Sequence, residues 1–163
     1  MADVERLLRE LARHEACYVI IGGMAAVAQG SAYLTADLDL CYARDRDNLQ
    51  RIANTLRPFR PMLRDAPRDL PSRLDAATLQ AGLNFSLTTD LGDVDLFGEV
   101  VGLGSYEQAV EFSEVIDLYG LQCRVLTLEG LIVSKKASGR PKDVQALPEL
   151  EALLELRGLG GRI

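Results

Sequence analysis

Two short segments of the chain alternate aspartate with apolar residues, and this pattern restricts the fold more than any other feature. The first segment, DLDL, holds Asp37 and Asp39, and the second, DVDL, holds Asp93 and Asp95. Alternation at period two is typical of a half-buried strand with its apolar residues on one face and its polar residues on the other. Aspartate is uncommon in strands because it favours turns and helix caps. Each carboxylate pair therefore needs a counter-charge on its own face of the strand.

The rest of the sequence alternates helix and strand patterns. Apolar residues at helical spacing predict helices at 3–14, 24–30, 45–57, 75–80, 128–139 and 141–156. We expect Asp45 as an N-cap and Gly30 and Gly139 as helix ends. Strand patterns cover 17–23, 36–42, 83–90, 93–100 and 121–128, and 107–120 indicates a helical turn followed by a strand. The expected architecture is one domain over 1–163, a mixed α/β (α+β) sheet with helices packed on it and an Arg/Pro-rich excursion at about 57–73.

Composition restricts the cellular context. The net charge of the 163 residues is −6, which argues against a non-specific grip on nucleic acid over the whole surface. No apolar run approaches the roughly 20 residues that span a bilayer, and the charged N-terminal segment does not resemble a signal peptide. The three widely spaced cysteines, Cys17, Cys41 and Cys123, are expected to be buried free thiols. Together these features predict a cytoplasmic protein without a membrane partner.

The chemistry of the aspartates points to a metal ion. If the two strands are neighbours, up to four carboxylates share one patch, and two such charges about 4 Å apart repel by about 4 kcal/mol at an effective dielectric constant of about 20. Protonation of one aspartate or a neighbouring Arg or Lys would offset this repulsion, and a divalent cation would offset it best. Oxygen ligands without His or Cys nearby favour Mg²⁺ or Mn²⁺ over zinc.

A glycine pair precedes the first aspartate segment. Gly22 and Gly23 follow a buried strand and open a helix. Backbone amides at such a point, with no side chain in the way, form an anion site suited to phosphate. Ser31 and Thr35 add hydroxyl donors shortly before Asp37. A glycine pair is also compatible with a simple strand-to-helix turn.

The combination of glycine pair and aspartate strand resembles the nucleotidyltransferase superfamily of DNA polymerase beta. The stretch IGGMAAVAQGSAYLTADLDL is similar to the small bacterial stand-alone nucleotidyltransferases related to the AbiEii-type abortive-infection toxins. The stretches GLNFSLTTDLGDVDLFGEV and KKASGRPKD also resemble this group, so the likeness covers most of the chain. One departure is Tyr33, which stands where many relatives carry an arginine.

The resemblance implies a nucleotidyltransferase-like fold and transfer of a nucleoside monophosphate from an NTP such as ATP to an acceptor hydroxyl. It implies two Mg²⁺ (or Mn²⁺) ions held by three carboxylates. The third carboxylate also acts as the base, and Asp93 is the alternative to Asp95 at this position. The implied catalytic and metal-binding residues are Asp37, Asp39 and Asp95. The candidate nucleotide-binding residues are Gly22, Gly23, Ser31, Thr35, Lys136 and Arg140. Asp143 is a candidate for orienting one of the basic residues.

The acceptor and the partners stay open. RNA such as a tRNA end, a protein hydroxyl and a small molecule all fit, and only the Arg-rich segment 57–73 favours RNA. A homodimer or a small helical antitoxin-like partner is expected, within a toxin–antitoxin system. The alternative is a non-catalytic nucleotidyltransferase-fold module that binds nucleotides or another protein. A Rossmann-like dinucleotide site is disfavoured because its three-glycine fingerprint is absent.

Overall fold

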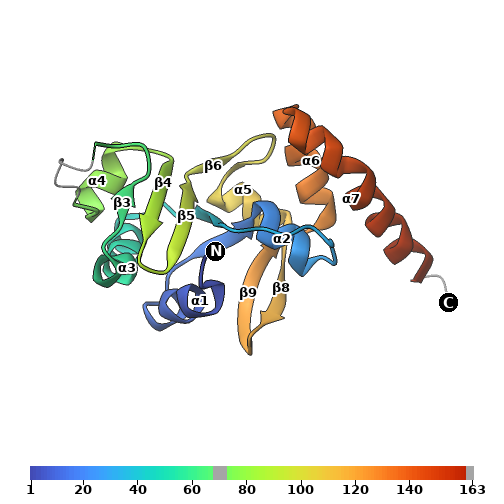
Figure 1. The fold of residues 1–163 in the computed structure, drawn as a ribbon. Coiled ribbons are helices and arrows are strands. Elements are labelled where there is room, and N and C mark those ends of the chain that lie inside the picture. Colours follow the sequence, from blue (N-terminus) through green and yellow to red (C-terminus); the bar gives the residue numbers. More distant parts are fainter. Residues whose placement is uncertain (68–72, 161–163) are drawn as a thin grey trace.

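The structure, a computed structural model, describes residues 1–67 and 73–160 and is built on a seven-stranded mixed sheet (Figure 1). In spatial order its strands are β3 (Met62–Leu63), β4 (Phe85–Thr89), β5 (Gly92–Phe97), β2 (Leu38–Tyr42), β1 (Tyr18–Ile21), β9 (Leu121–Leu126) and β8 (Ser113–Leu118). β2 runs parallel to β5, and β1 runs parallel to β9, whereas the other pairs are antiparallel. The predicted mixed α/β sheet is confirmed.

Helices surround this sheet, and the last of them extends away from it toward the C-terminus (Figure 1). They are α1 (Val4–Arg13), α2 (Gly22–Ala28), α3 (Arg46–Leu56), α4 (Ala76–Ala81), α5 (Tyr106–Glu111), α6 (Leu128–Ser138) and α7 (Pro141–Gly160), with a 3-10 turn at Arg57–Phe59. Asp45 caps α3 by accepting from the Asn48 amide, and Gly139 ends α6 in the left-handed conformation, as expected.

The structure differs from the sequence-based expectation in four places. α2 begins at Gly22 and is capped by Gln29 rather than Gly30, so the two glycines form its first turn. α7 continues to Gly160. A small two-stranded sheet, β6 (Glu99–Val100) and β7 (Gly104–Ser105), was not expected, because strands of two residues are too short to show a period. The excursion at 57–73 contains β3, and its residues 68–72 lie outside the described part of the chain.

On β2 and β5, apolar residues of the core alternate with aspartates. Leu38, Leu40, Val94 and Leu96 are at most 1% exposed and belong to the hydrophobic core, which also contains the buried leucines of α1 and α3. The aspartates alternate with these residues and so lie on the opposite face of β2 and β5. The core therefore fixes the direction in which the carboxylates point.

The structure also bears on the predictions about the cysteines and about membrane-spanning segments. Cys41 and Cys123 are buried and Cys17 is half-buried, and all three are free. Within the described residues, no helix combines the length and the apolar character that crossing a membrane requires.

Candidate functional site

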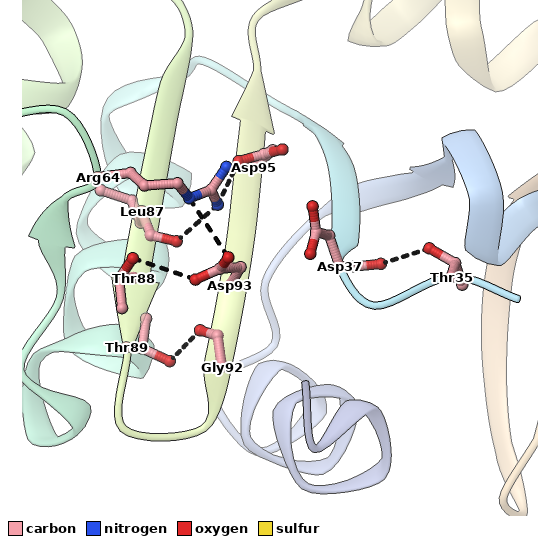
Figure 2. Close-up of polar contacts among 9 residues, drawn as sticks. All are labelled: Thr35, Asp37, Arg64, Leu87, Thr88, Thr89, Gly92, Asp93 and Asp95. Carbon is pink, nitrogen blue, oxygen red and sulfur yellow. Dashed lines mark hydrogen bonds and ion pairs between the residues drawn. The ribbon is translucent and has the colours of Figure 1, made fainter. Parts of the chain in front are cut away.

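The two aspartate strands are direct neighbours, and their parallel register sets Asp39 beside Asp95. Leu38 lies beside Val94 in the same register, so each carboxylate pair has an apolar pair next to it on the other face. Asp93, two residues before Asp95 on the same face of β5, accepts a hydrogen bond from the Thr88 hydroxyl at 3.1 Å. Asp37 stands just before β2, near this group (Figure 2). The tertiary structure thus brings the two DxD segments into one patch.

The electrostatics of the patch centre on Asp39. Burial raises the pKa of Asp39 to about 7, with further contributions from the negative charges of Asp95 and Asp37 and from a hydrogen bond with Asp95. The Lys142 ammonium opposes them by lowering this pKa. At neutral pH Asp39 is therefore only partly ionised, and a cation bound beside it would favour its charged form.

The glycine pair lies against the same carboxylate. Gly22 has φ +63°, and a Cβ at this position would lie 2.4 Å from Oδ2 of Asp39. A Cβ on Gly23 would lie 2.7 Å from Oγ1 of Thr35. Only glycine lets the start of α2 approach Asp39 and Thr35 so closely. The Thr35 hydroxyl donates to the Asp37 carbonyl at 3.3 Å, which ties the loop before β2 to the same region (Figure 2).

An arginine that we did not single out from the sequence occupies the patch. Arg64 follows the edge strand β3, and its Nη2 donates to Oδ1 of Asp95 and to the Leu87 carbonyl, at 2.9 and 3.0 Å (Figure 2). Its Nε lies 3.4 Å from Oδ2 of Asp93. Burial opposes the charge of Arg64, but Asp95, Asp93 and Asp37 together raise its pKa. A neighbouring arginine was one of the counter-charges that the sequence allowed.

The carboxylates fit a metal ion in chemistry but do not yet converge on one. Oδ1 of Asp39 is buried without a hydrogen-bond partner, and a bound cation would satisfy this oxygen. The donor set consists of oxygens, which suits Mg²⁺ or Mn²⁺. Within residues 1–67 and 73–160, however, no group of three or more His, Cys, Asp or Glu side chains has the arrangement of a metal site. Arg64 holds Asp93 and Asp95 in this arrangement.

The basic residues at the α6–α7 junction are distributed differently from the expectation. Lys136 pairs with Glu151 of α7 at 3.2 Å. Arg140 donates to Asp143 at 2.8 Å, so this aspartate does orient a basic residue. Lys142 is the member of the cluster whose charge reaches Asp39. Lys142 is exposed at the start of α7, and its charge makes it a further candidate for a nucleotide contact near Asp39.

Ser31 lies in a different contact from the one we expected. Its hydroxyl donates to Oε1 of Glu149 on α7, and the amide of Ala32 donates to Oε2 of the same residue at 3.4 Å. The loop that leads from α2 to β2 is thereby held by α7. Spacing alone placed Ser31 with Thr35, but only Thr35 contacts the Asp37 segment.

Arg64 was not singled out from the sequence. Lys142 belonged there to a candidate basic cluster with Lys135, Lys136 and Arg140, but without a role of its own. Arg64 belongs to the Arg/Pro-rich segment, in which no periodicity distinguishes one arginine from the next. Lys142 directly follows Pro141 at the start of α7, and its position relative to Asp39 depends on how α7 packs, which the local pattern does not show. The cluster of basic residues was the available signal for Lys142.

Comparison with known proteins supports the fold. No protein-family model matches the chain, and no curated protein matches it. Among solved structures, the crystal structure of a "putative nucleotidyltransferase" from Thermotoga maritima is similar to this chain, with a TM-score of 0.50 and 16% sequence identity, over 100% of this chain and 97% of that one. At this identity the likeness concerns the fold alone, and it confirms the nucleotidyltransferase-like mixed sheet that the aspartate motifs predicted.

Proposed function

We propose that this chain is a metal-dependent nucleotidyltransferase that moves a nucleoside monophosphate from an NTP to an acceptor hydroxyl. The observation that carries the proposal is the placement of Asp39 between Asp95 of the parallel strand β5 and the glycine start of α2. The similar fold of the Thermotoga maritima "putative nucleotidyltransferase" adds support at the level of the fold.

In the proposed reaction, the acceptor oxygen attacks the α-phosphorus of the NTP, the bond from that phosphorus to the bridging oxygen of the β-phosphate breaks, and pyrophosphate leaves. Asp95 takes the proton of the acceptor hydroxyl. Asp37 and Asp39, with Asp95, would hold Mg²⁺ or Mn²⁺, which when bound neutralises the triphosphate and the leaving pyrophosphate. The Gly22 and Gly23 amides would bind the terminal phosphates.

Lys142 extends the set of phosphate ligands that the sequence suggested. Its charge already acts on Asp39, so a triphosphate bound at Asp39 would lie within its field. We assign the phosphate contact to Lys142 ahead of Lys136, because Lys136 is engaged with Glu151. For the acceptor we propose RNA, a protein hydroxyl or a small molecule. From the resemblance of the sequence to AbiEii-type proteins we further propose a role in a toxin–antitoxin pair with a small helical partner.

The test is a transfer assay with α-labelled NTPs. Each nucleotide is incubated with Mg²⁺ or Mn²⁺ and a cell extract that contains RNA and protein. We expect label on one acceptor class with the wild type and with the control Asp47→Asn, whose carboxylate is exposed on α3, and no label with Asp39→Asn. Full transfer by Asp39→Asn would contradict the assignment of the site.

One observation favours the second candidate, a non-catalytic module that binds nucleotides or another protein. In the described residues the carboxylates are neutralised in part by Arg64 and form no ready metal site. Absence of label under every condition, together with no NTP binding in calorimetry, would favour this candidate.

A further inference from the structure

Among the described residues, Arg64 is a cationic side chain in contact with the carboxylate patch for which the proposed reaction has no use. Its guanidinium contacts both acidic residues of β5, Asp95 through Nη2 at 2.9 Å and Asp93 through Nε at 3.4 Å. These contacts are partly shielded from water, since the side chains of Arg64 and Asp95 are 29% and 16% exposed. Arg64 therefore carries the counter-charge that the sequence demanded, but only for β5.

Neither the carboxylate of Asp39 nor the guanidinium of Arg64 has all its polar atoms satisfied. Oδ1 of Asp39 is buried without a partner, although Asp39 and Asp95 are neighbours in the register. Nε of Arg64 is also buried and makes no hydrogen bond, because its approach to Asp93 is an ion pair without good hydrogen-bond geometry. A doubly charged ion would satisfy both Asp39 and Asp95, which one guanidinium on β5 does not.

The backbone that carries Arg64 is weakly held. β3 has only two residues, Met62 and Leu63, which are 39% and 42% exposed, and it pairs with β4 alone. The Arg64 amide donates to the Ser86 carbonyl at 2.9 Å, and the side chain then crosses β4 to reach β5 (Figure 2). A short edge strand of this kind moves at low free-energy cost.

We propose that Arg64 is the resident counter-cation of this patch, and that a divalent cation binds at Asp39 and Asp95 only by displacing the Arg64 guanidinium from Asp95. This inference rests on the proposed metal site and adds a competition to it. Arg64 lowers the affinity of the site for the ion, and ion binding releases the guanidinium from β5.

The first measurement is Mn²⁺ binding, followed by electron paramagnetic resonance, for the wild type, Arg64→Gln and Arg60→Gln. Arg60 forms an exposed ion pair with Asp90 at 2.9 Å and serves as the matched control. We expect Arg64→Gln to bind Mn²⁺ about tenfold more tightly, because the ion no longer displaces a charge-assisted hydrogen bond, and Arg60→Gln to bind as the wild type does. Equal or weaker binding by Arg64→Gln overturns the competition while leaving the metal site intact.

The second measurement uses the wild type alone, so it does not depend on the folding of a variant. The Nε–H resonance of Arg64 is followed by NMR during titration with Mg²⁺. We expect it to shift with the same midpoint as the signals of Asp39 and Asp95, as their contacts are exchanged. Movement of the aspartate signals without movement of the Arg64 resonance overturns the competition. No change in any of these signals, with no Mn²⁺ binding to any protein, overturns the metal site and with it this proposal.

Discussion

Replacement of Asp39 by asparagine should stabilise the metal-free protein, the reverse of the usual effect of altering a buried polar residue. Burial and the charges of Asp95 and Asp37 raise the pKa of Asp39 from 3.8 to about 7. The native state therefore binds a proton that the unfolded state has released across this interval, so stability falls as pH rises from about 4 to about 7. The difference of about three pKa units corresponds to about 4 kcal/mol at pH 8, at about 1.4 kcal/mol each.

Asparagine has nearly the shape of the carboxyl group and cannot ionise, so it avoids this penalty. We expect Asp39→Asn to exceed the wild type by about 2 to 4 kcal/mol in free energy of unfolding at pH 8, and to match it at pH 4. The measurement is urea unfolding followed by circular dichroism at pH 4, 6 and 8, with a chelator present. Asp47→Asn, at an exposed position in the first turn of α3, is the control and should show no such pH dependence.

The same experiment with excess Mn²⁺ should reverse the order, because ion binding stabilises only the protein that retains the ligand. A variant that is less stable than the wild type at pH 8 with the chelator present would refute the reasoning. It would mean that the Asp39 carboxylate makes a stabilising structural contact rather than an unfavourable charge.

Three other substitutions have expected outcomes. Gly22→Ala should lower the free energy of unfolding by about 2 kcal/mol or more and weaken Mn²⁺ binding, because the new Cβ meets Oδ2 of Asp39 at 2.4 Å. The control is Gly139→Ala, at φ +65° with nothing within 4 Å, which should show the cost of backbone strain alone. Equal losses of stability in the two variants would contradict the predicted clash with Asp39. Asp143→Asn should lower the free energy of unfolding by about 2 kcal/mol at pH 7. Hydrogen bonds from Ser138 and Arg140 and the charge of Lys135 outweigh burial and lower the pKa of Asp143 to about 2. The loss, measured by urea unfolding, should disappear as pH falls toward 2, and a loss independent of pH would assign the effect to packing. Lys142→Ala should weaken NTP binding in calorimetry severalfold while Lys136→Ala should not, and the reverse result would restore Lys136 to the site.

Local pattern was sufficient for the faces of the strands and for most element boundaries. In DLDL and DVDL the period of two separates Leu38 and Leu40 from the aspartates, and burial of the leucines makes that separation fixed in the structure. The cap at Asp45 and the stop at Gly139 were likewise predictable, because each depends on one side chain or one backbone angle within a single turn. The segment 57–73 had no period, so β3 within it was not predictable.

The sequence by itself determined that two carboxylate pairs exist, that each faces away from the core, and that a glycine pair precedes the first. Only the tertiary structure decided that β5 lies parallel beside β2, which sets Asp39 against Asp95 although the two residues are 56 positions apart in the sequence. It also decided that Arg64 reaches β5 from the edge strand, and that the charge of Lys142 lowers the pKa of Asp39. The physical reason is that side-chain alternation follows from local backbone geometry, whereas the choice of neighbouring strand and the reach of a long cationic side chain depend on how distant elements pack around one core.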